Sequence, residues 1–386
     1  MKQRIEVIDS LRGFAILAIM LLHSIEHFNF YVFPDASLQP DWLNAIDKVV
    51  WDTMFFLFGG KGYAIFSILF GFTFSLMMVK QRQQDKDFGY RFLWRMLLLV
   101  GFALLNGAFF PGEVLLMYAL VGLVLFFVRN LKSQIVLVVA ILLLSQPIEW
   151  YRCLQYLNDP DFVMPVRHSG QYWQFLKEGQ MSDSFWQLVK SNTLYGHKVS
   201  LLWAFEVGRI VQTAGLFVIG FWLGNTNRFA DTKENASFWL KTLLVSTLLF
   251  IPLMILFNIR KDIFMDATLV KIIKPIIEMY RNLSFTFVLV SAFILLYKIP
   301  FFKRLVGGLK YPGRMSLTAY VMQSMIGGFV FYGYGLGIGP HVSHTVALCV
   351  GIVLFAIQFY FCKWWINKYK QGPLEKLWHQ LTWINK

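Results

Sequence analysis

Several long stretches of this chain contain no charged residue, and they constrain the fold more than any other feature. Two of them are the segments 97–110 and 345–361. A helix needs about 20 mostly apolar residues to cross a bilayer, and hydrocarbon offers no water to satisfy an irregular backbone. Charged residues make up 15% of the chain, well below the roughly one quarter that is typical of soluble domains. We therefore predict an all-α, polytopic transmembrane helix bundle.

The apolar pattern predicts ten membrane-spanning segments within a single transmembrane domain, 1–386. The third and fourth segments are separated only by Pro111 and Gly112, a turn signal that predicts a tight hairpin. The eighth is interrupted by Glu278, Arg281 and Asn282, and a broken helix or a re-entrant segment lining a cavity would also give this pattern. The expected spans are 11–31, 50–79, 91–110, 112–128, 133–151, 202–224, 237–258, 272–298, 314–334 and 343–366.

Basic residues concentrate in alternate connections, and this predicts the orientation of the chain. Short cytoplasmic loops carry an excess of Lys and Arg. The first connection of the opposite set, 29–49, holds three aspartates, Asp35, Asp41 and Asp47, against Lys48 alone. We therefore expect both termini in the cytoplasm, although the connection 258–274, with four basic residues, runs against the pattern.

The formal net charge of +14 fits the same topology. A basic inner surface would attract anionic membrane lipid or a phosphorylated cosubstrate. Nucleic acid is not an expected partner, because no basic stretch outside the membrane is interleaved with exposed aromatic residues. The three cysteines are scattered and imply neither a disulfide framework nor a zinc ribbon. The segment 1–13 carries charges of both signs, which favours a retained first helix over a cleavable signal peptide.

The connection 152–200 is long and contains several Trp and Tyr residues. In the predicted topology it lies outside the cytoplasm. Loops of this length are often lids or binding elements. An amphipathic insertion lying on the outer leaflet is the alternative.

The first predicted span carries an unusual stripe of ionisable residues. At about 100° per residue, Arg12 and His23 lie on one face of a helix, and Glu26 and His27 lie within about 60° of that line. The helical rise places His23 about 16 Å above Arg12. Ionisable groups are costly against lipid, so this stripe is expected to face the bundle or a water-filled cavity.

Three interpretations of the stripe remain open. In the first, His23 is a catalytic base and Arg12 binds an anionic cosubstrate. In the second, His23, Glu26 and His27 form a metal site of the H-x-x-E-H type. In the third, the polar groups are structural and bond to neighbouring helices. No clear third-ligand motif follows, only isolated residues such as Glu149, His168 and His197, so we expect no metal.

Short motifs throughout the chain resemble the YeiB-like family of bacterial membrane proteins. They begin with Ile-Asp-Ser-Leu-Arg-Gly-Phe-Ala-Ile-Leu at 8–17 and continue in the order expected of that family. The resemblance places the chain in a bacterial cytoplasmic (inner) membrane. The other matching segments are 66–71, 106–122, 313–320 with Gln323, 331–335 and 372–375.

The YeiB-like family is in turn similar to the lysosomal heparan-glucosaminide N-acetyltransferase and other transmembrane acyltransferases. This resemblance implies transfer of an acyl group from cytoplasmic acetyl-CoA, or another acyl-CoA, to an extracytoplasmic glycan or lipid-linked acceptor. Arg12 and His23 match the Arg-x10-His spacing of membrane O-acyltransferases. Many YeiB-like sequences have Asn where this chain has His23, and the departure favours catalysis here. Homodimers are common in such families.

The residue types suit this chemistry. A neutral His23 could take a proton from the acceptor while Glu26 orients its ring. Arginines can grip phosphates through two parallel hydrogen bonds, although each is also explained as an anchor of the cytoplasmic side. The residues expected to bind acyl-CoA are Arg12, Arg91, Arg95 and Arg314.

A second group of polar residues is expected to contact the substrate. Glu113 either binds the acceptor or caps the helix that follows it, where a carboxylate is favoured. Lys61 is expected to face a cavity or to snorkel. The same arrangement would also suit a transporter or flippase for an anionic small molecule or lipid, and an intramembrane metalloprotein is a third class. The candidate substrate-binding residues are His27, Glu113, Asn106, Lys61 and Gln323.

Overall fold

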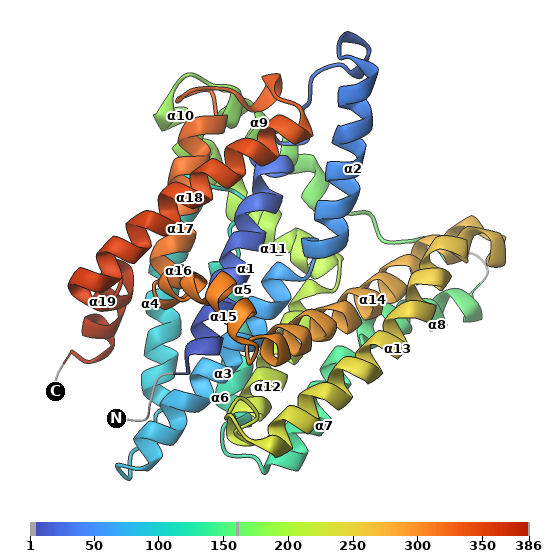
Figure 1. Ribbon diagram of the computed structural model, residues 1–386. Coiled ribbons are helices and arrows are strands. Elements are labelled where there is room, and N and C mark those ends of the chain that lie inside the picture. Colours follow the sequence, from blue (N-terminus) through green and yellow to red (C-terminus); the bar gives the residue numbers. More distant parts are fainter. Residues whose placement is uncertain (1–4, 160–161, 385–386) are drawn as a thin grey trace.

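The computed structural model describes residues 5–159 and 162–384, and all regular secondary structure in these ranges is helical (Figure 1). The predicted all-α class is confirmed. The α-helices are α1 (Glu6–Ile25), α2 (Asp41–Phe58), α3 (Gly62–Arg82), α4 (Gly89–Phe109), α5 (Leu115–Val121), α6 (Leu123–Val128), α7 (Ser133–Leu144), α8 (Pro147–Asn158), α9 (Trp173–Met181), α10 (Phe185–Ser191), α11 (His197–Glu206), α12 (Arg209–Asn225), α13 (Lys233–Ile263), α14 (Ala267–Leu296), α15 (Pro300–Val306), α16 (Lys310–Arg314), α17 (Ser316–Phe331), α18 (His344–Tyr369) and α19 (Pro373–Thr382).

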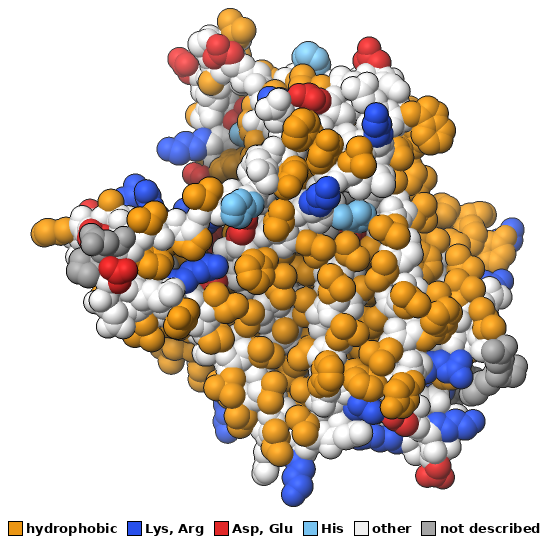
Figure 2. Space-filling model, turned by 180° about the vertical axis from the view of Figure 1, so that it is seen from behind, with side chains coloured by type: hydrophobic (Ala, Val, Ile, Leu, Met, Phe, Trp, Pro, Cys, Tyr) orange, Lys and Arg blue, Asp and Glu red, His pale blue; other side chains and the backbone are white. Residues whose placement is uncertain are grey.

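Six of the described helical segments are long and apolar enough to cross a membrane, and up to eight if each of two bent helix pairs counts as one span. Two shorter apolar helices, 115–128 and 316–331, complete the set. Each of the ten expected spans overlaps one of these segments. The space-filling view shows a broad apolar band with charged side chains toward its ends (Figure 2). The chain thus has the architecture of a multi-pass membrane protein.

Four expected spans, 50–79, 112–128, 133–151 and 202–224, each divide into two helices. Two of these breaks contain a glycine with a positive φ. The span 50–79 divides into α2 and α3 at 59–61, where Gly60 has a φ of +75°. The span 202–224 bends by 79° between α11 and α12, where Gly208 has a φ of +71°. Only glycine adopts such angles readily. A Cβ at Gly208 would also lie 2.3 Å from Oε1 of the buried Glu149, so the Glu149 carboxylate would have to move.

The span 272–298, for which a break was one possibility, is a continuous helix, α14. Glu278 and Arg281 are three residues apart and attract each other electrostatically, so the helix accommodates both without breaking. The first helix is shorter than expected, since α1 ends at Ile25 and the chain then turns. Glu26 and His27 consequently lie beyond the helix that was expected to carry them.

The 152–200 connection is largely helical in its described part, comprising the end of α8, then α9, α10, a π-helical turn and the start of α11. It packs over one end of the bundle. Trp173 contacts Phe30, with 5.8 Å between ring centroids, and the amide of Gly333 donates a 2.8 Å hydrogen bond to the carbonyl of Gln180. Residues 160 and 161 lie outside the described ranges.

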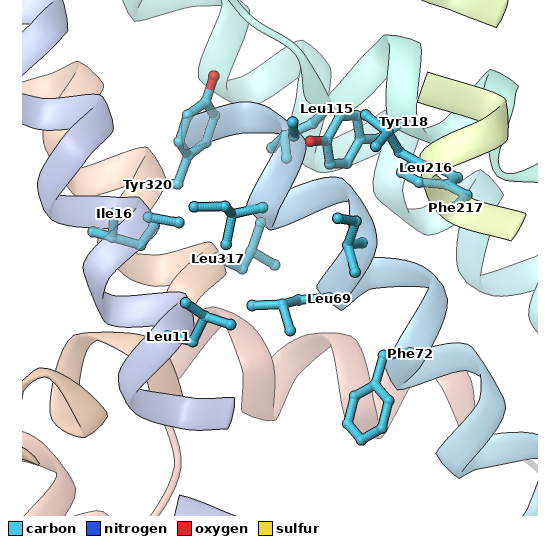
Figure 3. Packing of buried hydrophobic residues seen from close by; sticks show 14 of the residues in the cluster. Leu11, Ile16, Leu69, Phe72, Leu115, Tyr118, Leu216, Phe217, Leu317 and Tyr320 are labelled. Atoms are coloured by element: carbon cyan, nitrogen blue, oxygen red, sulfur yellow. The ribbon is translucent and has the colours of Figure 1, made fainter. Parts of the chain in front are cut away.

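Helix α1 runs through the centre of the bundle, whereas α13 and α14 form a long hairpin that projects from it (Figure 1). The core closes where α1, α3, α5, α12 and α17 converge, and apolar side chains from all five meet there (Figure 3). The residues labelled in that view are Leu11, Ile16, Leu69, Phe72, Leu115, Tyr118, Leu216, Phe217, Leu317 and Tyr320.

Candidate functional site

A cavity of about 500 Å³ lies beside α1, between α3, α4, α5, α17 and α19. Three of the four arginines expected to bind acyl-CoA line it: Arg12, Arg95 and Arg314. Lys370 adds a further cation. The remaining wall is mostly apolar and aromatic, with side chains such as Phe66, Leu69 and Phe92. The cavity therefore combines a cationic lining with an apolar one.

Arg12 is held between two helices. Its guanidinium donates a 2.5 Å hydrogen bond to Oγ1 of Thr73 on α3 and a 3.1 Å hydrogen bond to Oδ1 of Asp9 on α1. Its side chain keeps 16% of its surface exposed. Asp9 and Thr73 thus fix the orientation of Arg12 while part of the guanidinium stays accessible.

Arg314 enters the cavity from α16, which crosses α1 at very short range. A Cβ at Gly313 would lie 1.7 Å from the carbonyl oxygen of Asp9, so only glycine permits this crossing. The guanidinium of Arg314 donates a 3.0 Å hydrogen bond to the carbonyl of Lys370. The crossing therefore carries Arg314 to the cavity that Arg12 also lines.

The C-terminal helix α19 covers the arginines of α4. Arg95 stacks on Trp378 and donates a 3.0 Å hydrogen bond to Oγ1 of Thr382. Arg91 donates to the carbonyl of Thr382 at 2.9 Å and stacks on Trp383. Arg91 does not line the large cavity but a smaller cleft of about 370 Å³ nearby. Both arginines are thus already engaged by α19.

Glu375 on α19 caps a different helix, α17. One carboxylate oxygen accepts hydrogen bonds from the amides of Leu317 at 2.7 Å and Thr318 at 3.1 Å, and the other accepts from Oγ1 of Thr318 at 2.6 Å. Burial raises the pKa of the Glu375 carboxyl, against the effect of these hydrogen bonds. A carboxylate at a helix N-terminus satisfies amides that have no partner within the helix. Glu375 therefore ties α19 to α17.

His23 lies away from the cavity, in an aromatic cluster. Its ring is 5.0 Å from that of Phe110, 4.9 Å from that of His27 and 5.9 Å from that of Phe28. It is not among the residues that line the cavity. Phe110 begins the non-helical segment 110–114, and the next residue, Leu115, lines the cavity. This segment therefore connects a residue that contacts His23 to a residue that lines the cavity.

Glu26 pairs with His27. Its Oε1 lies 2.6 Å from Nδ1 of His27, and its Oε2 accepts a 3.2 Å hydrogen bond from the hydroxyl of Tyr31. The carboxylate expected to orient His23 thus lies against the next histidine instead. Among the described residues, no three His, Cys, Asp or Glu side chains gather closely enough to hold a metal ion.

The remaining candidates occupy separate places. The carboxylate of Glu113 accepts hydrogen bonds from the amides of Leu115 and Leu116, so it caps α5. Gln323 bonds the carbonyl of Ile16 at 3.0 Å and thereby joins α17 to α1. Asn106 is fully buried, and neither of its amide atoms has a hydrogen-bond partner within the described chain. Lys61 lies at the α2–α3 break.

Three residues of the site were not expected from the sequence: Thr73, Glu375 and Trp378. Thr73 follows an apolar run and resembles an ordinary helix hydroxyl. Glu375 belongs to the segment 372–375, which matches the YeiB-like pattern, but the sequence did not indicate that it caps another helix.

The comparisons with known proteins agree with the YeiB-like resemblance. A family model described as a protein of unknown function (DUF418) matches residues 223–385. The chain is 26% identical to the uncharacterized protein YxaH of Bacillus subtilis (strain 168), over 99% of this chain and 95% of that protein. It is 24% identical to an uncharacterized 39.9 kDa protein in the amylase 3' region of Bacillus acidopullulyticus, over 100% of this chain and 95% of that protein.

The uncharacterized protein YeiB of Escherichia coli (strain K12) is 26% identical, over 98% of this chain and 96% of its own length. The similarity therefore runs through all the helices. No solved structure matches the chain.

Proposed function

We propose that this chain is a membrane acyltransferase. It would move an acyl group, expected to be acetyl, from cytoplasmic acyl-CoA to an extracytoplasmic glycan or lipid-linked acceptor. The observation that carries the proposal is the cavity that Arg12, Arg95 and Arg314 share with an apolar, aromatic wall. Acyl-CoA matches this lining, because its polyanionic phosphates suit the arginines and its uncharged thioester end suits the apolar wall.

The arginines suit the phosphates. A guanidinium binds phosphate oxygens through a planar fork of donors, and apolar surroundings strengthen that attraction relative to water. Arg12 is already oriented by Asp9 and Thr73, so little side-chain freedom is lost on binding. Arg95 would exchange part of its contact with α19 for the ligand.

His23 would act as the general base. The acceptor hydroxyl oxygen attacks the thioester carbonyl carbon while its proton passes to the imidazole. The carbon–sulfur bond then breaks, and the departing CoA sulfur takes the proton back. In this scheme the acyl group moves from the cavity toward His23, whose ring contacts Phe110.

A transporter or flippase for an anionic small molecule or lipid is the second candidate. The helix breaks at 59–61 and at 207–208 favour it, since discontinuous helices commonly form the substrate sites of transporters. Movement of an anionic lipid across reconstituted vesicles, without any product of acyl transfer, would support this candidate over the enzyme.

Binding of acetyl-CoA to the purified full-length chain tests the proposal. We expect a thermal shift that rises with ligand concentration and is weakened in Arg12→Gln. Arg304→Gln is the matched control, because Arg304 is exposed on α15 and outside the cavity. The proposal fails if the wild-type chain binds no acetyl-CoA at millimolar concentration.

A further inference from the structure

Lys61 is a buried cation with few protein partners. It lies in the break between α2 and α3, and only 3% of its surface is exposed. Its ammonium donates one long hydrogen bond, 3.3 Å, to the carbonyl of Phe55 and lies 5.7 Å from the ring centre of Phe285. An ammonium has three N–H donors, and a charge at membrane depth is costly unless compensated. The ammonium of Lys61 therefore has N–H groups that can donate hydrogen bonds to a ligand.

Further cations lie on the α13–α14 hairpin. The guanidinium groups of Arg281 and Arg260 both stack on Phe257, at 3.9 Å and 4.0 Å from its ring centre. Lys61 is repelled by Arg281 and attracted by Glu278. Lys61 and Arg281 thus share one carboxylate, Glu278, that acts on both, and like charges in a poorly solvated place repel strongly. A bound anion would remove this imbalance.

One polar atom close to the α2–α3 break lacks a hydrogen-bond partner within the described chain. Asn282 follows Arg281 on α14, and its buried Oδ1 has no hydrogen-bond partner in the described chain. Its Nδ2 lies 2.9 Å from where a Cβ of Gly60 would be, so the α2–α3 break faces this amide. Buried polar groups in folded proteins are normally paired. The group formed by Lys61, Arg281 and Asn282 therefore has the character of a ligand site.

The surroundings of this group are apolar and partly exposed. Phe56 on α2 packs against Phe285, with 5.0 Å between ring centroids, and Phe285 packs against Phe250 at 4.8 Å. Beyond these rings, α2 and the hairpin diverge (Figure 1), and a notch separates the two on the opposite face (Figure 2). Exposed side chains such as Leu248 and Ile251 continue the apolar surface along α13.

We infer that Lys61 and Arg281 bind the phosphate of an anionic phospholipid that enters sideways between α2 and the α13–α14 hairpin. The half-buried Arg281 meets the headgroup first, and Lys61 donates to it from the interior. The acyl chains lie against the apolar side chains of the hairpin. This site is separate from the arginine cavity and does not depend on acyl transfer.

Thermal unfolding of the full-length chain in neutral detergent tests this site. We expect added phosphatidylglycerol to raise the Tm by several degrees and phosphatidylcholine to have little effect. In Lys61→Met and in Arg281→Gln the affinity for phosphatidylglycerol should fall about tenfold or more, because a charge-assisted hydrogen bond is lost. Lys274→Gln is the control, since Lys274 is an exposed cation on the same helix.

Inorganic phosphate separates the two sources of the anion. If phosphate alone stabilises the chain as strongly as phosphatidylglycerol, the site takes a free anion and the lipid assignment is wrong. Equal stabilisation by both lipids, or an unchanged response in both variants, also overturns it. If Lys61→Met does not fold, native mass spectrometry of the wild type and Arg281→Gln decides, because retained phosphatidylglycerol should be lost in the variant.

Discussion

The guanidinium carbon of Arg95 lies 4.0 Å from the ring centre of Trp378, so the last helix of the chain covers an arginine of the central cavity. The indole Nε1 of Trp378 also donates a 3.2 Å hydrogen bond to the carbonyl of Arg95. The two residues are 283 positions apart in the sequence. Their contact makes α19 part of the cavity wall.

Replacing Trp378 should loosen this wall. Trp378→Leu removes the cation–π contact and the indole hydrogen bond, which together contribute about 1–2 kcal/mol. The Tm in detergent should fall accordingly. Trp364→Leu serves as the control, because Trp364 is 53% exposed on α18. An equal loss of Tm in both variants would contradict this role of Trp378.

Glu375 should make stability depend on pH. Burial raises the pKa of its carboxyl above the ordinary value of 4.5, so the folded chain binds the proton more tightly than the unfolded chain. The corresponding stabilisation is complete below the unfolded pKa and is lost as the pH rises through the folded pKa. In Glu375→Gln this part of the pH dependence should disappear from Tm measurements made as the pH rises above 4.5. A pH profile identical to that of the wild type would exclude this contribution.

Arg12 should be sensitive even to a conservative change. Arg12→Lys keeps the charge but loses the planar fork that bonds Thr73 and Asp9 at once. We expect the Kd for acetyl-CoA to rise about tenfold, because lysine binds phosphate as a point charge. Calorimetric titration of the purified chain measures this. Arg304→Lys should bind as the wild type does, and equal weakening in both variants would argue against a specific role for Arg12.

His23 and His27 should differ in their effects. His23→Ala should lower the rate of acyl transfer about 10²–10⁴-fold, as for loss of a general base, while acetyl-CoA binding persists. His27→Ala should have a smaller effect, because it removes one partner of Glu26 and one ring contact of His23 but leaves the proposed base in place. Transfer of labelled acetyl groups in membrane vesicles measures both. Stoichiometric zinc that is lost in His27→Ala would instead support the metal interpretation.

Two glycines offer a matched test of the bend between α11 and α12. Gly208→Ala places a Cβ 2.3 Å from Oε1 of Glu149 at a φ of +71°, so it should destabilise the chain by about 1–2 kcal/mol or more. Gly101→Ala on α4 has no atom within 4 Å of the new Cβ and should be neutral or stabilising by about 0.5–1 kcal/mol. Comparison of the two Tm values decides, and an unchanged Tm in Gly208→Ala would contradict the strain at this bend.

The candidate site was only partly predictable. Arg12, Arg95 and Arg314 were expected to act together, and all three line one cavity. Their place in connections predicted to be cytoplasmic was the clue, because basic residues near the ends of neighbouring spans are expected to gather at one membrane face. The placement of Glu26 against His27 was not foreseeable, since α1 ends at Ile25 and the turn after it changes the direction of both side chains.

The sequence by itself determined that the chain is a helical membrane protein, and where its apolar helices run. Helices can be predicted in this way because their backbone hydrogen bonds join residues four apart and bilayer depth sets their length. Only the tertiary structure decided which residues meet, such as Arg95 with Trp378 or Gly60 with Asn282 at a helix break. Such contacts depend on how each helix is rotated and where it breaks, and both follow from packing between distant segments.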